Sequence, residues 1–217
     1  MEIKTTSPAL VTTAKARAYS SATQAVSNSV FAKIQLNTES YDPGSNFDIS
    51  ELVSGTADGT TADHLIDSGT NFVTSGVVAG DRVKNTTDTT YAYVTVVANG
   101  DLTLDGDIFV DTETYEIKKA RFVAPVTGYY LVTAAFRYQT FEDGKWAYIM
   151  IYKNGVVISY GVRSSGTTAR LGAETSDIVS LTADDYLELW TYHDCAAAKA
   201  LQEGSANTFI AVHLLSV

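Results

Sequence analysis

The sequence predicts an all-β fold, and three features predict it. Short apolar runs recur along the 217 residues, separated by Gly, Asn or Asp turn signals at the spacing of a β-sandwich. The turn Lys153-Asn154-Gly155 places Asn-Gly between two apolar runs, which favours a type I′ hairpin. No segment has the periodicity of a long amphipathic helix, and the small-residue stretch 196–201 is expected to form at most a short helical turn.

The elements follow in order along the chain. Residues 1–16 are rich in Thr, Ser and Ala and are expected to form a tail that attaches the protein to a larger assembly. Strands are expected at Ala18-Tyr19 and over 31–36. After residue 120 the expected strands begin at Phe122 and continue over 129–136, 147–152, 156–160, 178–181, 186–192 and 209–215.

Composition excludes several classes of protein. Cys195 is the only cysteine, so neither an intrachain disulfide nor a zinc site made of several thiolates can form. The formal net charge of −10 argues against a nucleic-acid partner. No run approaches the ~18 apolar residues that span a bilayer. We therefore expect a soluble chain without membrane insertion, and the polar N-terminal segment indicates that it is not conventionally secreted.

The most informative motif lies at the first strand after residue 120. An aromatic residue, an Ala-Pro pair, a glycine and a tyrosine occur there at fixed spacing, as Phe122, Ala124, Pro125, Gly128 and Tyr130. Proline fixes φ at a strand end and gives no ladder donor. Glycine lets the chain enter the next strand without a Cβ clash.

A second block precedes it, with Phe31 and Asn37 followed by a turn that carries Tyr41, Asp42 and Phe47. In order and spacing, the two blocks resemble the C1q/TNF-like family. The C-terminal strand 209–215 is similar in character to the closing strand of that family. The resemblance implies a jelly-roll β-sandwich of the C1q/TNF-like type, formed by residues 17–50 and 120–217, and a homotrimeric, non-enzymatic head.

The block 51–119 has no counterpart in the family pattern, in which the turn leads almost directly into the Ala-Pro strand. We interpret it as an inserted small β-barrel or β-sandwich domain that projects from the jelly roll. Its strands are expected at the short β-favouring runs that turn residues separate, namely 71–73, 81–85, 91–97, 102–104, 108–110 and 115–117.

Three of the expected strands are apolar on both faces, namely 129–136, 147–152 and 209–215. One face can pack inside a sandwich, and the other can meet neighbouring protomers. The alternative is a monomer whose second face is covered by loops or by the inserted domain. His213 belongs to one of these faces and is expected to be a structural imidazole.

No motif selects catalytic residues. His64 and His193 are not near a nucleophile elbow, and the cluster His193-Asp194-Cys195 is expected in a solvent-facing loop. The segment 101–107 holds three aspartates, but their spacing does not match a calcium loop. Some members of the family bind calcium near the trimer apex, so calcium stays open as an ion, without ligands that can be named here, and no other cofactor is expected.

Animal members of the family are secreted and usually follow a collagen stalk, whereas this sequence has neither a Gly-X-Y repeat nor a signal segment. That departure favours a phage or bacterial source. We expect a phage virion protein, a fibre, spike or decoration tip, that binds a host glycan or protein through its inserted domain and other virion proteins through its tail. A structural capsid or tail component that cements subunits, and a bacterial C1q-like adhesin, remain alternatives.

Overall fold

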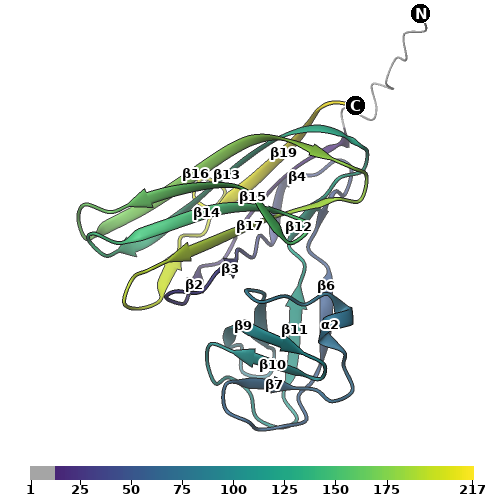
Figure 1. Cartoon of the computed structure of the whole chain (residues 1–217), viewed down its shortest axis with the longest axis vertical. Helices are drawn as coiled ribbons and strands as arrows, with labels where there is room; N and C mark the ends of the chain where they lie inside the picture. Colours follow the sequence, from purple (N-terminus) through teal and green to yellow (C-terminus); the bar gives the residue numbers. More distant parts are fainter. Residues whose placement is uncertain (1–12) are drawn as a thin grey trace, which may run out of the picture.

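The computed structural model describes residues 13–217, and nearly all of its regular structure is antiparallel β-sheet (Figure 1). Most of the predicted tail therefore lies outside the described residues. The first described strand, β1, begins at Lys15, slightly before the predicted start of the jelly roll at residue 17. No helix within residues 13–217 is long and apolar enough to cross a membrane.

Two sheets form a sandwich. The first, seven-stranded, consists of β1 (Lys15–Tyr19), β2 (Gln24–Val26), β4 (Thr38–Tyr41), β13 (Gly128–Phe141), β16 (Ala169–Leu181), β18 (Lys199–Leu201) and β19 (Phe209–Ser216). The second, six-stranded, consists of β3 (Ala32–Lys33), β5 (Phe47–Asp48), β12 (Arg121–Val123), β14 (Trp146–Lys153), β15 (Val156–Ser164) and β17 (Tyr186–His193).

The pairing of the long strands defines the fold. The first strand, β1, pairs with the last, β19, and β12, the first strand after the small module, pairs with β17. Inside these pairs, β13 joins β16, and β14 joins β15. A chain that folds back on itself in nested antiparallel pairs and wraps them into two sheets is a jelly roll. The predicted fold class is therefore confirmed.

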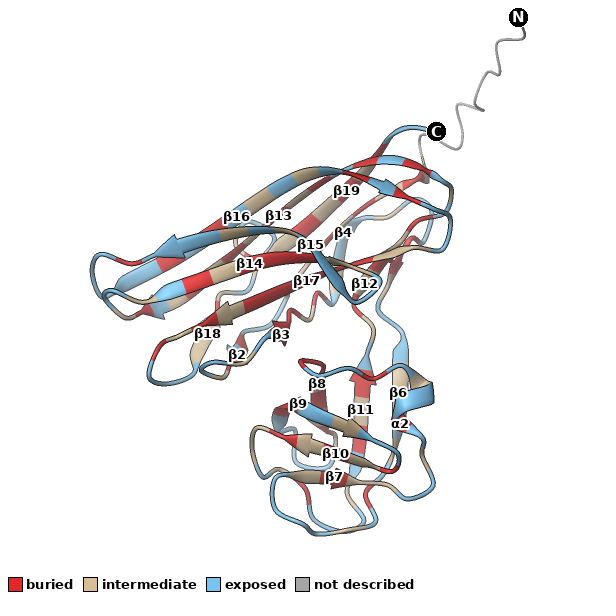
Figure 2. Ribbon diagram, in the orientation of Figure 1, coloured by how far each residue is buried: buried red, intermediate tan, exposed pale blue. Residues whose placement is uncertain are grey.

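Alternation along the strands builds the core of the sandwich. In β13 the even-numbered positions from Tyr130 to Tyr138 are buried, and their neighbours are exposed or half-buried. The facing sheet contributes Ile149, Ile151 and Leu189 to the same cluster. Figure 2 shows the buried residues along β13, β14 and β17, whereas β15 is largely exposed.

Residues 51–118 form a separate six-stranded sheet, which we call the small module. Its strands are β6 (Glu51–Thr56), β7 (His64–Ile66), β8 (Arg82–Asn85), β9 (Tyr91–Ala98), β10 (Asp101–Leu104) and β11 (Thr114–Lys118). They enclose their own cluster of buried side chains, which includes Phe72, Leu102 and Ile117. The paired strands β6 and β11 join the small module to the sandwich (Figure 1), and the Lys119 N–H donates to the Ser50 carbonyl at 3.0 Å.

The small module covers part of the outer face of the second sheet. Lys33 of β3 lies there beside Trp190 of β17, its strand partner. The Lys33 ammonium nitrogen is 2.6 Å from a carboxylate oxygen of Asp81, in the small module, and 2.8 Å from one of Glu188. Burial by itself would lower the pKa of Lys33, but the two carboxylates outweigh it, and the pKa is raised above its usual value. The ammonium therefore stays charged at the junction.

A second contact crosses the same junction. Tyr93 of β9 packs with the core of the sandwich instead of the core of its own module. Its hydroxyl donates to the Ala25 carbonyl at 2.6 Å and accepts from the Gln24 amide at 2.8 Å. These contacts dock the small module on the sandwich.

The structure corrects the predictions at several local elements. The predicted strand 71–73 is helix α2 (Phe72–Ser75), because the Asn71 side chain caps it by accepting from the Thr74 N–H. Residues 108–110 are not a strand, since the Asn85 and Glu113 side chains bind their backbone at Ile108 O and Val110 N. Only Ala32–Lys33 of the predicted strand 31–36 pairs. The predicted turn at 196–201 instead contains strand β18.

The predicted hairpin is confirmed. Asn154 and Gly155 have φ of 51° and 79°, the left-handed values that a type I′ turn requires at both central positions. The strands on either side, β14 and β15, pair along their length.

Candidate functional site

The first motif block forms part of the core. Phe122 and Tyr130 are buried, with ring centroids 5.8 Å apart in an edge-on contact, and Ala124 is also buried. The Tyr130 hydroxyl donates to the Val126 carbonyl at 2.7 Å, which ties the strand to the turn before it. Pro125 lies exposed at that turn.

Position 128 requires glycine because there is no room for a Cβ, and not because of its backbone φ angle. A Cβ there would lie against the Ser216 carbonyl and 2.7 Å from Leu214 Cδ1. The glycine therefore lets β13 approach the end of β19.

The second block holds a turn. The Asp42 carboxylate accepts from the Phe47 N–H at 2.6 Å, and Phe47 is buried. Asn37 accepts from the Ser21 N–H at 2.8 Å. Tyr41 contacts His213 of β19 through its hydroxyl, and Phe31 is 52 % exposed, with its ring 4.7 Å from that of Tyr192. The motif residues thus hold turns and core, and they do not gather around one pocket.

No segment within residues 13–217 lies across the outer face of the first sheet, which we call the open face. It is carried by alternate residues of β13 and β19: Tyr129, Leu131, Thr133, Ala135, Phe209, Ala211, His213 and Leu215. Tyr129 is 56 % exposed and Leu215 49 %. None of these eight residues carries a formal charge at pH 7 when the histidine is neutral, but the flanking strands add Lys15, Arg17 and Glu174 to the same face, opposite His213, Ala211 and Ala135. An apolar strip with charged residues at its sides is typical of an interface.

The centre of the open face is hollow because its side chains are small. A depression of about 450 Å³ lies over Thr133, Ala135, Ser176 and Phe209, and Glu174 also lines it. A protruding side chain from another molecule can enter it.

A second apolar surface lies on β15, the edge strand of the second sheet. Its exposed residues include Val156, Ile158, Tyr160 and Val162, and Tyr160 is 65 % exposed. The free edge of β15 lies beside β16 of the first sheet, where the Ser159 and Thr175 hydroxyls are 3.2 Å apart and Arg163 lies 3.5 Å from Glu174. The exposed side chains of β15 and the open face are different surfaces of the same chain.

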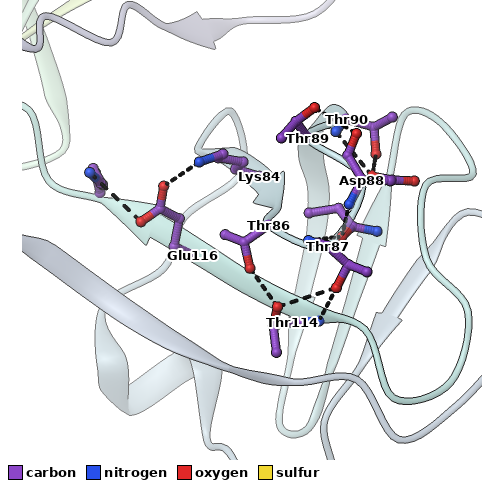
Figure 3. A network of polar contacts seen from close by, with 10 residues as sticks. Lys84, Thr86, Thr87, Asp88, Thr89, Thr90, Thr114 and Glu116 are labelled. Carbon is purple, nitrogen blue, oxygen red and sulfur yellow. Dashed lines mark hydrogen bonds and ion pairs between the residues drawn. The ribbon is translucent and has the colours of Figure 1, made fainter.

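A polar groove of about 200 Å³ separates the small module from the sandwich. Its residues are Gln35, Asn37, Arg82, Lys84, Tyr91, Glu116 and Lys118. Alternation explains why they meet: Val83 of β8 and Ile117 of β11 point into the core of the small module, so Arg82, Lys84 and Glu116 lie on the opposite face. Figure 3 shows the Lys84 ammonium directed at the Glu116 carboxylate, 3.2 Å away.

Side-chain hydrogen bonds support one end of this wall. The Thr114 hydroxyl lies 2.6 Å from that of Thr86 and 3.3 Å from that of Thr87 (Figure 3). These contacts join the turn after β8 to the start of β11. The groove residues on the two strands are therefore held side by side.

His193 and His64, which the sequence analysis considered as catalytic candidates, both contact other side chains of the fold. His193 lies in the sandwich, not in a solvent-facing loop as predicted, because its ring packs edge-on against Tyr138 with centroids 5.4 Å apart. His64 Nδ1 lies 2.7 Å from a carboxylate oxygen of Asp101. Cys195 is buried too, which raises the pKa of its thiol.

The acidic segment 101–107 is divided among separate contacts: Asp101 meets His64, and Asp105 accepts from the Tyr93 N–H at 2.6 Å. In the part of the chain that the structure describes, no three His, Cys, Asp or Glu side chains are grouped as metal ligands.

Reasoning from the sequence missed the groove. The signal was present as alternation, since Arg82 and Lys84 flank one core residue and Glu116 and Lys118 flank another. What it could not show was the opposite wall, Gln35 and Asn37, which comes from the sandwich.

Comparisons with known proteins bear on the fold alone. No protein-family model matches the chain, and no curated protein matches it. Among solved structures, it is similar to Eiger TNF from S. frugiperda, with 10 % identity and a TM-score of 0.45 over 93 % of this chain and 91 % of that one. It is also similar to murine APRIL at pH 5.0, with 13 % identity and a TM-score of 0.37 over 70 % and 96 % of the two chains. These proteins are of the fold type that the sequence resembles, and the assignment of a jelly roll rests on the strand pairing.

Proposed function

We propose that this chain is a non-enzymatic homotrimeric binding head of a phage virion: a fibre, spike or decoration tip that recognises a host-surface glycan or protein. The observation that carries the trimer is the open face. Of the two sandwich sheets, one has its outer face partly covered by the small module, and the other presents Tyr129, Leu131 and Leu215 to solvent.

The occupant of the open face is a second copy of this chain. The depression over Thr133 and Ala135 accepts protruding side chains, and β15 supplies them in the exposed Tyr160 and Val162. Because the two surfaces differ, the contact is heterologous, and a heterologous contact closes into a ring when its rotation divides a full turn. The resemblance of the sequence to the C1q/TNF-like family selects three copies. An obligate interface of this kind buries on the order of 2,000 Å² or more.

A trimer explains how weak sites serve binding. Three copies of one site on a rigid axis gain avidity, because the second and third contacts form at high effective concentration. We place the site in or beside the small module, which leaves the sandwich by its paired strands β6 and β11 (Figure 1).

The trimer is tested by light scattering on the purified chain. We expect a mass three times that of the 23.3 kDa protomer, and a smaller mass for Leu131→Glu. The matched control is Val96→Glu, at a residue of the small module that is 57 % exposed. A stable wild-type monomer would overturn the trimer. The same measurement with a chelator tests for a structural ion.

Binding and location are tested separately. The virion setting predicts that mass spectrometry of purified phage particles detects the chain, and particles that lack it would refute this part. If the site lies in or beside the small module, a variant that lacks residues 51–119 should still form a trimer but should no longer bind host cells. Normal cell binding by that variant would instead favour a site on the sandwich. Particles that contain the chain but bind cells equally well without it would favour the alternative of a structural cement.

A further inference from the structure

We propose that the groove between the small module and the sandwich binds an acidic saccharide, with the sugar carboxylate held by Arg82 and its neighbours. This inference rests on the proposed function, since it names the ligand class of a site beside the small module. Four features of the groove lead to it: an unpaired guanidinium, an excess of positive charge, an aromatic platform and one carboxylate.

Arg82 is the central feature. Its guanidinium carbon lies 3.7 Å from the centroid of the Tyr91 ring, and its side chain makes no salt bridge or hydrogen bond with the described residues. The guanidinium Nε is buried and has no hydrogen-bond partner there. Burial lowers the pKa of Arg82, yet an arginine stays charged. A half-buried cation without an acid is costly in free energy, so an anion from outside the chain is its expected partner.

The opposite wall repeats this pattern. The Gln35 side-chain nitrogen is also buried without a hydrogen-bond partner among the described residues, while the Gln35 backbone N–H donates to the Gln24 side chain at 2.8 Å. Each unpaired group is a hydrogen-bond donor of a residue that lines the groove. Two unused buried donors at one groove are unusual, since buried polar groups are normally paired.

The charge of the groove has the opposite sign to that of the chain. Three cations, Arg82, Lys84 and Lys118, face the single carboxylate of Glu116, so the groove is net positive in a protein of net charge −10. Glu116 accepts from Lys84 at 3.2 Å and lies 3.7 Å from Lys118. One carboxylate thus serves two ammonium groups, and Arg82 has none.

The remaining groups favour a sugar over a bare anion. Tyr91 lines the groove and is 47 % exposed; one face of its ring lies against the Arg82 guanidinium, and the rest of the ring is left for a sugar. A carboxylate such as Glu116 accepts hydrogen bonds from hydroxyl groups and repels a doubly charged phosphate. The volume of about 200 Å³ is below the ~300–1,000 Å³ of pockets for drug-sized ligands, and so is suited to a single sugar residue.

The test is to titrate the full-length trimer with monosaccharides and to measure binding by calorimetry and by saturation-transfer NMR. Glucuronate and N-acetylneuraminate are the acidic probes, glucose is the neutral one, and inorganic sulfate is the anion without a ring. We expect an acidic sugar to bind at least tenfold more tightly than glucose. Arg82→Gln should weaken that binding at least tenfold, and Lys118→Gln, at an exposed residue, should weaken it less.

Arg170→Gln is the matched control, because it removes the same charge from an exposed site on the sandwich. It should leave binding unchanged. Equal binding of glucuronate and glucose, or unchanged binding by Arg82→Gln, would overturn the inference. Sulfate that binds as tightly as the acidic sugars would overturn the sugar class. The mass of each variant by light scattering checks that it is still folded and assembled.

Cell-binding assays separate this inference from the proposed function. A trimer that binds acidic sugars through Arg82 but binds no cells upholds the groove and refutes the receptor-binding role. Cell binding without any binding of acidic sugars upholds that role and refutes the groove.

Discussion

His193 shows how a single residue is constrained by its surroundings. Its Nε2–H donates to the Val26 carbonyl at 3.0 Å, while Nδ1 is buried without a partner among the described residues. Burial lowers the pKa of His193 below its ordinary value of 6.5. The folded state therefore holds the neutral ring, and protonation favours unfolding.

The first prediction follows from this sign. The stabilisation by neutral His193 is complete above about pH 6.5 and decreases as the pH falls below it. The difference in unfolding free energy between wild type and His193→Gln should narrow from pH 7.5 to pH 5. Urea unfolding at each pH measures it. A difference that stays constant over this range would contradict the prediction.

Gly128 gives the second prediction. Gly128→Ala places a Cβ against the Ser216 carbonyl and 2.7 Å from Leu214 Cδ1, so β13 and β19 must move apart. We expect a loss of about 1–3 kcal/mol in unfolding free energy, as for overpacking in general. Gly166→Ala, where nothing lies within 4 Å of the new Cβ, is the control and should change stability little. Equal stabilities of the two variants would show that the close approach is unimportant.

At the scale of an element, the β14–β15 hairpin depends on Asn154 in two ways. The residue has a φ of 51°, which Asn tolerates better than most residues. Its amide also donates to an Asp185 carboxylate oxygen at 2.6 Å, and its carbonyl oxygen accepts from the Tyr186 N–H at 2.9 Å. The turn is thereby tied to the start of β17.

The third prediction concerns this turn. Asn154→Ala should cost about 1–3 kcal/mol, because it adds left-handed strain and removes both hydrogen bonds. Asn99→Ala is the control, since Asn99 is exposed and its side chain has no partner among the described residues. Thermal and urea unfolding compare the two. A loss as small as that of the control would mean that Gly155 alone determines the turn.

Asp185 gives the fourth prediction. Hydrogen bonds from Lys153 and Asn154 lower the pKa of its carboxyl from 3.8 to about 2. A carboxyl with a lowered pKa stabilises the fold above its unfolded pKa, and this stabilisation is lost as the pH falls from 3.8 towards 2. Asp185→Asn should therefore be less stable than wild type at pH 5, with the gap closing by pH 2. A gap that widens on acidification would contradict it.

At the scale of the whole molecule, the Lys33 cluster joins the small module to the sandwich. The Lys33 side chain is 3 % exposed, and its ammonium group forms ion pairs with both Asp81 and Glu188. Gly80 has φ of 93°, and a Cβ there would lie 2.8 Å from Trp190 Cη2. The close approach of the Gly80 backbone to Trp190 and the ion pairs of Lys33 therefore lie at the same junction between the small module and the sandwich.

The fifth prediction is that Lys33→Met costs about 3–5 kcal/mol, because it leaves two buried carboxylates without a cation. Adding Asp81→Asn and Glu188→Gln should recover most of the lost stability, since the amides are uncharged and their carbonyl oxygens still accept hydrogen bonds. Trp190 fluorescence during urea unfolding reports the contact, because its indole N–H donates to Glu188. The control, Arg163→Met, breaks an exposed pair with Glu174 and should cost less than about 1 kcal/mol. A triple variant no more stable than Lys33→Met would refute the charge argument.

Much of the architecture was predictable from local patterns. The apolar, β-favouring runs of β13, β17 and β19 and the Asn154-Gly155 turn are properties of neighbouring residues, so the sequence predicts those strands and the hairpin. The exceptions are also local in origin. Asn71 caps a helix where a strand was predicted. Strands β6 and β7 were not predicted because Glu51–Thr56 and His64–Ile66 are short and mixed in polarity.

The sequence by itself determined the all-β class, the positions of the long strands and the acidic charge. Only the tertiary structure decided which faces stay open and where a groove forms. The physical reason is that Arg82 and Gln35 are far apart in the chain and become neighbours only when the small module docks through Lys33, Asp81 and Tyr93. Period-two alternation tells which residues share a face of a strand, but what covers that face depends on long-range packing.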